Sequence, residues 1–341
     1  MFDNNRSRTR SIGKNSPHSK SDREAVTGIF NGTAIVGRPP EKMYFRIFLR
    51  LFLSQSCIVL PMLCSRVARL PCRLSVHFSE SLRAYAASSS SPCFSTLCGK
   101  SAIVTGGGSG IGQGIALGLA AEGVNVVVTG RRVDALQSTV DLAETLSGTV
   151  EPYSTDVVDR DQSALIEHVV EQHGRLDILV NNAGTNITNR ALKDLSLDDW
   201  HETINTNLNG AFHMIHAALP QMRLQQDGLI VQITSIAGKR TLANLSGAAY
   251  CASKFAQQSL GSAINVEEHE NGIRCTNIAP GEVVTPILDK RPQPPSQERR
   301  SLMLTPADVA AAVVMVAKLP KVAHVTEIVM SGKTTVSESV L

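Results

Sequence analysis

The chain has 341 residues, of which 43% are hydrophobic and 4% aromatic, a composition typical of a globular protein. Its net charge of +3 is unevenly divided: residues 1–98 hold fourteen Lys and Arg against five Asp and Glu, whereas residues 99–341 hold nineteen against twenty-five. The later region is therefore mildly acidic, which excludes a general nucleic-acid-binding surface there.

The first hundred residues predict an N-terminal extension, residues 1–97, rather than a folded domain. Residues 1–42 are polar and basic without periodicity, which predicts disorder. The apolar run 51–65 is too short for a membrane span. Residues 66–92 are rich in Arg, Ser and Ala with one acidic residue, which is typical of a transit peptide for a mitochondrion or plastid. A secretory signal, or a disordered extension of a cytoplasmic protein, remains an alternative.

The seven cysteines predict neither a metal site nor a disulfide framework. Five of them lie in residues 57–98. Cys93 and Cys98 have four residues between them, but no matching second pair follows, so a zinc site is not expected. Cys251 and Cys275 are expected to be buried thiols, which fits a reducing compartment.

From Lys100 onward, short apolar runs alternate with helical segments, and this alternation predicts βαβ units. We therefore expect a single Rossmann-type, doubly wound parallel sheet of about seven strands, with helices on both faces, over residues 98–333, followed by a polar tail, 334–341. Six strands can be delimited, at 102–105, 124–128, 176–180, 229–233, 273–278 and 325–330. The expected helices are 111–122, 134–146, 161–173, 198–223, 249–268 and 306–318, and a Pro-rich loop is expected at 291–300.

A glycine-rich turn follows the first strand and opens the first helix. It reads Thr105-Gly-Gly-Gly-Ser-Gly-Ile-Gly112. Glycines permit a sharp turn and close backbone approach, and the helix N-terminus then offers free N–H groups to a pyrophosphate. Because the strand and helix stand in the required order, the turn predicts a dinucleotide site. No Lys-Ser/Thr pair follows, so it is not a Walker loop.

The end of the second strand indicates which dinucleotide binds. An acidic residue there marks NAD, whereas arginine accommodates the 2′-phosphate of NADP. Arg131 and Arg132 follow Gly130, and no acidic residue comes before Asp134. The sequence therefore predicts NADP(H) in preference to NAD(H), with Arg131 as the main phosphate partner.

Tyr250 and Lys254 lie four residues apart in the predicted helix 249–268, and Ser235 lies fifteen residues before the tyrosine. Residues four apart share one face of a helix. A cation one turn away lowers the pKa of a phenol, which makes the phenol a usable general acid and base. Ser235 could hold a substrate oxygen.

With these motifs in order, residues 98–331 resemble the short-chain dehydrogenase/reductase family. The resemblance implies that Asn207, in Thr206-Asn-Leu-Asn-Gly210, joins Ser235, Tyr250 and Lys254 as the fourth member of the catalytic set. It also implies a set of cofactor-binding residues: Thr105, Gly106, Ser109, Gly110, Ile111, Gly112, Arg131, Arg132, Asp156, Val157, Asn182, Ala183, Gly184, Tyr250, Lys254, Pro280, Gly281 and Thr285.

The resemblance implies a mechanism that the residue chemistry supports. Ser235 would polarise a carbonyl group and Tyr250 would donate a proton as hydride arrives from the nicotinamide. Lys254 would lower the pKa of Tyr250 and hold the nicotinamide ribose, and Asn207 would position a water that resupplies the proton. The hydride chemistry itself belongs to the cofactor.

The substrate is less constrained than the reaction. The apolar side chains Ile287, Leu288, Leu302 and Met303 suggest a pocket for a small apolar carbonyl compound or alcohol. An alternative is a 3-oxoacyl reductase acting on carrier-bound chains, for which Arg190, Lys193, Lys239 and Arg240 would form a basic rim. An alternative of another class is a nucleotide-binding scaffold or sensor without turnover. The resemblance implies that helices 198–223 and 249–268 pack a homodimer or homotetramer, and the small residues of 248–264 suit such a close approach of helices.

Overall fold

The computed structural model of the protein describes residues 95–333. The predictions for the targeting segment and for the polar tail concern residues outside this range and stay predictions. Among the helices of residues 95–333, none is long and apolar enough to cross a membrane.

Seven parallel strands form one sheet in the order β3-β2-β1-β4-β5-β6-β7, which confirms the predicted doubly wound architecture. From β1 the sheet grows through β2 to β3 on one side and then from β4 to β7 on the other. The strand order therefore reverses between the neighbours β1 and β4. The seventh strand, β3, is the one whose bounds the sequence pattern does not predict. The strands are β1 (Ser101–Thr105), β2 (Asn125–Gly130), β3 (Val150–Ser154), β4 (Ile178–Asn181), β5 (Gly228–Ile233), β6 (Ile273–Pro280) and β7 (Glu327–Met330).

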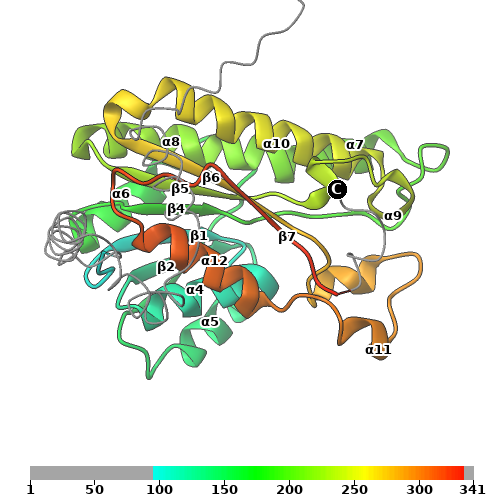
Figure 1. Ribbon diagram of the computed structural model, residues 1–341, viewed down its shortest axis with the longest axis horizontal. Helices are drawn as coiled ribbons and strands as arrows, with labels where there is room; N and C mark the ends of the chain where they lie inside the picture. Colours follow the sequence, from blue (N-terminus) through cyan, green and yellow to red (C-terminus); the bar gives the residue numbers. More distant parts are fainter. Residues whose placement is uncertain (1–94, 334–341) are drawn as a thin grey trace, which may run out of the picture. The chain divides into compact units, whose positions relative to one another are not determined.

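Helices cover both faces of the sheet (Figure 1). One face is covered by α4 (Gly110–Ala121), α5 (Val133–Leu142) and α12 (Pro306–Lys318). The other is covered by α6 (Ser163–His173), α8 (Gly210–Gln225) and α10 (Ala248–Glu267), with α7 (Leu197–Ile204) beside α10.

Successive strand residues contribute to opposite cores, because side chains of a strand alternate between the two faces of a sheet. In β1, Ala102 and Val104 pack with α4 and α12, whereas Ile103 between them packs with α6 and α8. Both cores are apolar, which explains why the central strands read as nearly continuous hydrophobic runs.

Three segments differ from their predicted form. The helix predicted at 198–223 is divided into α7, a π-helical turn η1 (Asn205–Asn209) and α8. The helix predicted at 134–146 ends at Leu142, because the following residues fold into turns that precede β3. The predicted loop 291–300 contains the short helix α11 (Gln297–Arg300), capped by Ser296.

Short elements complete the loops at the carboxyl ends of the strands. They are the 3-10 turns η2 (Ile236–Gly238) after β5 and η4 (Pro286–Lys290) after β6, and the single-turn helix α9 (Ala243–Ser246) before α10. A further 3-10 turn, η3 (His269–Asn271), joins α10 to β6 at the opposite end of the sheet.

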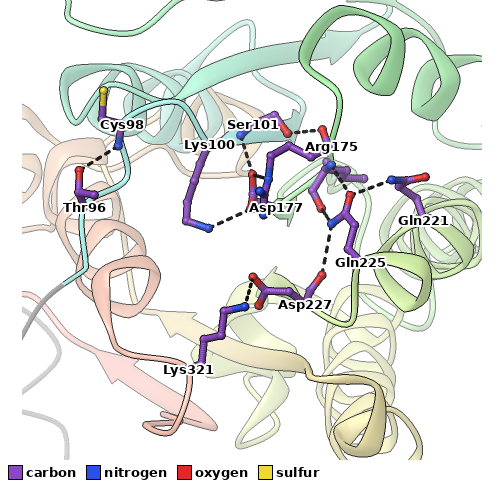
Figure 2. Close-up of polar contacts among 11 residues, drawn as sticks. Thr96, Cys98, Lys100, Ser101, Arg175, Asp177, Gln221, Gln225, Asp227 and Lys321 are labelled. Atoms are coloured by element: carbon purple, nitrogen blue, oxygen red, sulfur yellow. Dashed lines mark hydrogen bonds and ion pairs between the residues drawn. The ribbon is translucent and has the colours of Figure 1, made fainter.

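At the amino ends of β1 and β4, a buried carboxylate joins the two central strands (Figure 2). Asp177 accepts hydrogen bonds from Lys100 Nζ at 2.9 Å, the backbone N–H of Ser101 at 3.0 Å and Arg175 Nε at 2.7 Å. Its side chain is 3% exposed. These charge-assisted bonds hold the sheet together at the end away from the glycine-rich turn.

Candidate active site

A cleft of about 670 Å³ lies at the carboxyl ends of the strands, at the reversal between β1 and β4. Ligands of open α/β sheets bind at such a reversal. The structure brings most of the predicted site residues together in this cleft: Gly106, Ser109, Gly110, Ile111, Arg131, Arg132, Asp156, Val157, Asn182, Ala183, Gly184, Ser235, Tyr250, Lys254, Pro280, Gly281 and Thr285. Thr105, Gly112 and Asn207 do not line it and lie behind its walls.

The glycine-rich turn has the shape of a phosphate cradle. Gly106 and Gly110 have φ of +64° and +57°, a region in which side-chain-bearing residues are strained. A Cβ at Gly110 would lie 3.0 Å from Thr285 Cγ2, across the cleft entrance. Helix α4 has no acidic residue in its first turn and no side-chain cap, so its first N–H groups remain for an anion. These residues fit a dinucleotide pyrophosphate.

Thr105 positions the cleft wall instead of facing it. Its Oγ1 accepts the backbone N–H of Asn182 at 3.0 Å and of Ala183 at 2.9 Å. The side chain of Asn182 donates in return to the Thr105 carbonyl at 2.9 Å. These bonds tie the end of β1 to the end of β4, which fixes the two loops that flank the cleft.

The end of β2 carries the two arginines that the sequence assigned to cofactor recognition. Both line the cleft and both are exposed. Arg131 lies 3.6 Å from Asp156, an ion pair between partly solvated groups that contributes little to stability. A pair this weak leaves the guanidinium available to a phosphate.

Tyr250 and Ser235 meet at the other end of the cleft. Ser235 lies two residues after β5 and caps η2, where its Oγ accepts the N–H of Ala237 at 3.1 Å. Burial raises the pKa of Tyr250 above its ordinary value, while a hydrogen bond with Ser235 and the positive charges of Arg291 and Arg190 oppose that rise. The phenol therefore stays protonated at neutral pH, as a proton donor requires.

Lys254 is buried beside the ring of Tyr250. Its Nζ donates to the Ile233 carbonyl at 2.9 Å and to Gln257 Oε1 at 2.8 Å, and lies 5.7 Å from the centre of the Tyr250 ring. Burial lowers the pKa of Lys254 to about 7. The role that the sequence assigned to Lys254, lowering the pKa of Tyr250, stays a prediction.

Asn207 lies in the π-helical turn η1 and is fully buried. Its Oδ1 accepts the Thr185 N–H at 2.7 Å, and its Nδ2 donates to the Thr185 carbonyl at 3.1 Å and to Ser253 Oγ at 3.0 Å. Ser253 in turn donates to the Tyr250 carbonyl at 2.8 Å. Asn207 therefore connects the cleft wall to the first turn of α10.

Several polar residues that complete the site belong to no motif that the sequence predicts. Gln257 holds Lys254 and donates to Gln232 at 3.1 Å; both glutamines are fully buried. The available signal was Gln232 itself, a polar residue inside the apolar run of β5. Arg190 was expected at a basic rim, yet it is buried in the cleft wall. Arg291 also lines the cleft, and nothing in its Pro-rich segment marked it.

Comparisons with known proteins agree with this geometry. Residues 100–295 match the family model of the short chain dehydrogenases. The chain is 38% identical over 197 residues to the 3-oxoacyl-[acyl-carrier-protein] reductase FabG of Thermotoga maritima, covering 57% of this chain and 78% of that one. It is 34% identical over 233 residues to an uncharacterized oxidoreductase of Staphylococcus aureus strain N315, covering 68% of this chain and 96% of the relative.

Two solved structures share the fold and were determined with a bound dinucleotide. A metagenomic short-chain oxidoreductase in complex with NADP has a TM-score of 0.60 at 30% identity, covering 69% of this chain and 98% of that one. An alcohol dehydrogenase from the archaeon Thermococcus sibiricus, complexed with 5-hydroxy-NADP, has a TM-score of 0.61 at 28% identity, covering 68% and 96%. The sheet, the cleft and these matches together place the chain in the short-chain dehydrogenase/reductase family of oxidoreductases.

Proposed function

We propose that the protein is an NADP(H)-dependent oxidoreductase that interconverts a carbonyl group and an alcohol, with Tyr250 as general acid and base. The observation that carries the proposal is that Tyr250 and Ser235 interact in one cleft that the glycine-rich turn also lines. Two adjacent hydroxyls can bind one carbonyl oxygen, and the phenol can give it a proton.

Each residue has a role that its contacts support. Ser235 donates a hydrogen bond to the substrate oxygen and Tyr250 protonates it. Lys254, near Gly184 and the Ile233 carbonyl, faces the part of the cleft where a ribose would lie. Asn207 is a positioning residue, since its three hydrogen bonds fix Thr185 and Ser253. The bound nicotinamide supplies or accepts the hydride.

Replacing Tyr250 by phenylalanine removes the proton donor and leaves the ring. We expect turnover with a carbonyl substrate to fall by about 10²–10⁴-fold, the usual contribution of a general acid. NADPH binding, measured by fluorescence titration, should change little. The matched control is Tyr153→Phe, on β3 and outside the cleft; it should keep wild-type turnover. Retained turnover in Tyr250→Phe would remove the assignment.

The preference for NADP(H) rests on Arg131 and Arg132. The charge and exposure of Arg131 suit a 2′-phosphate, and the two NADP-bound relatives are consistent with it. We expect a lower KM for NADPH than for NADH. Arg131→Ala should raise the NADPH value by about tenfold and leave the NADH value nearly unchanged, as for loss of one charged hydrogen bond. The exposed Arg160, outside the cleft, provides the control substitution Arg160→Ala. A lower KM for NADH in the wild type would contradict the preference.

A second candidate activity is the reduction of carrier-bound 3-oxoacyl chains, favoured by the 38% identity to the Thermotoga enzyme. The basic rim expected for a carrier is weak, however. Lys239 is paired with Glu327 at 2.6 Å, and Arg190 is buried. Comparing a 3-oxoacyl carrier thioester with small free carbonyl compounds in the same NADPH assay separates the two activities.

The assembly and location of the enzyme are further proposals. Phe212 on α8 and Phe255 and Val266 on α10 are large apolar side chains with 48%, 42% and 74% exposure. They support a homodimer or homotetramer formed through these helices. Light scattering on the purified protein measures the assembly, and N-terminal sequencing of the mature protein tests import into a mitochondrion or plastid.

A further inference from the structure

A buried arginine lies in the wall of the cleft, at the end that holds Tyr250. Arg190 belongs to the segment between β4 and α7 and is 7% exposed. Its Nη1 donates to the Leu245 carbonyl at 3.1 Å and its Nη2 to the Lys290 carbonyl at 2.9 Å. Its Nε is buried and makes no hydrogen bond within residues 95–333. A guanidinium has five N–H groups, so donors remain.

No carboxylate among the described residues forms an ion pair with Arg190. The acidic residue of this part of the cleft is Glu282, and it is shared by two other arginines, at 2.6 Å from Arg291 and 3.0 Å from Arg299. Burial and the charge of Arg291 lower the pKa of Arg190, while Tyr250 raises it. A buried charge without a counter-ion costs free energy, and proteins normally pair it.

The surrounding backbone keeps the arginine in this costly position. Gly247, three residues before Tyr250, has φ of +82°, and a Cβ there would lie 2.5 Å from Arg190 Cβ. Asn186 of the same segment donates to the Ser246 carbonyl at 3.0 Å. The segment is thus packed against the beginning of α10, so Arg190 has a defined place relative to the tyrosine.

We propose that Arg190 binds a carboxylate of the substrate, so that the enzyme acts on oxo acids and the corresponding hydroxy acids. This inference rests on the proposed oxidoreductase function and names the substrate class for the same cleft. The carboxylate would supply the missing counter-ion and accept the N–H groups of Nη1 and Nη2 that the two backbone carbonyls leave free. It takes no part in bond changes: the carbonyl carbon gains a hydride, its oxygen gains the Tyr250 proton, and the phenolate recovers a proton from water.

The competing explanation is that Arg190 is a structural strut, that is, a residue that only holds two loops together and binds no substrate. Its two bonds join α9 to η4, and both elements flank the cleft. A strut would affect all substrates equally, whereas a carboxylate receptor affects only acids. The tests therefore compare each acid with an uncharged analogue of similar size.

The first test uses the wild-type protein with NADPH and a panel of 2-oxo and 3-oxo acids, each paired with its methyl ester. We expect kcat/KM to be at least about 30-fold higher for the acid than for the ester in the best pair, as for a buried charge pair. Esters or carrier thioesters reduced as well as the acids would overturn the proposal.

The second test uses Arg190→Gln, Arg190→Lys and the control Arg160→Gln, which removes an exposed charge outside the cleft. Arg190→Gln should raise KM for acids about 30-fold or more and leave the esters nearly unchanged, and Arg190→Lys should retain part of the preference. Arg160→Gln should behave as the wild type. Equal losses on acid and ester would identify a strut and overturn the proposal. If Arg190→Gln does not fold, Arg190→Lys and the wild-type ratio decide.

A binding measurement separates failure of this inference from failure of the proposed function. With NADP⁺ present, butanoate should raise the melting temperature of the wild type more than butanamide does, and this difference should vanish in Arg190→Gln. If no carbonyl compound is reduced at all, the oxidoreductase proposal fails, yet this shift still supports the carboxylate site. Equal effects of butanoate and butanamide on the wild type would overturn it.

Discussion

At the residue scale, the electrostatics of Tyr250 and Lys254 follow from burial. Burial disfavours the charged form of each group, so the pKa of the phenol is raised and that of the ammonium is lowered to about 7. At neutral pH the tyrosine is therefore protonated, and the lysine loses its proton more readily than an exposed lysine does. A protonated phenol beside Ser235 suits the donation of a proton to a carbonyl oxygen.

The lowered pKa of Lys254 has a consequence for stability. Between pH 7 and 10.5 the unfolded chain holds a proton on this lysine that the folded protein has lost, so the free energy of unfolding rises with pH in that window. The rise is at most about 1.4 kcal/mol per pH unit. Lys254→Met should lack it. Urea unfolding at pH 7, 8 and 9 measures the difference, and parallel profiles for both proteins would contradict it, because all other titrating groups are shared.

At the scale of elements, the π-helical turn η1 sets the position of α8, the helix that follows it. The Gly210 N–H donates to the Asn205 carbonyl, five residues back, which inserts one extra residue into the turn. A Cβ at Gly210 would lie 2.6 Å from Val157 Cγ2, so the glycine lets the helix approach the cleft. The apolar spacing of this segment predicts an uninterrupted helix. The π-helical turn could not be predicted from it, because the hydrogen-bond partners of Asn207, Thr185 and Ser253, come from two other segments.

Removing the Asn207 side chain should loosen both of those segments. Asn207→Ala removes the three hydrogen bonds to the Thr185 N–H, the Thr185 carbonyl and Ser253 Oγ, at a cost of about 1–3 kcal/mol in the free energy of unfolding. We also expect kcat to fall by about tenfold or more as the first turn of α10 shifts. Asn209→Ala, which loses a single bond to Asn205, should cost about 1 kcal/mol or less. Similar losses in both variants would contradict the role of Asn207.

At the scale of the described molecule, the two ends of the sheet have different tasks. The carboxyl ends open into the cleft, whereas the amino ends are joined by Asp177 with its bonds to Lys100, Ser101 and Arg175 (Figure 2). Burial opposes ionisation of Asp177, but the hydrogen bonds and the charge of Lys100 outweigh it, and the pKa is lowered. The residues that stabilise the sheet at its amino end are thus separated, by the length of the strands, from the residues that line the cleft.

Asp177→Asn should destabilise the protein and leave kcat/KM nearly unchanged. The expected loss at pH 7 is about 1–3 kcal/mol, as for hydrogen bonds to a charged group. Because the folded pKa lies below the unfolded value of 3.8, this contribution is present above pH 3.8 and is lost as the pH falls through the folded pKa. Denaturation from pH 7 to 2 should show the two proteins converging. Glu122→Gln, whose carboxylate is 36% exposed and whose partner Lys318 is 29% exposed, serves as control and should cost less than about 1 kcal/mol.

The sequence by itself determined the parallel sheet and the family. Apolar runs ending in glycines specify buried strands and sharp turns locally, and Tyr250 and Lys254 share a helix face because of the helical repeat. Only the tertiary structure decided which charges surround the phenol. Arg190 and Arg291 lie in loops and are 101 residues apart in the sequence, and packing of those loops, together with Gly247, places them at the cleft. Burial and distance set the interaction energy between charges, and neither can be predicted from the local pattern of residues.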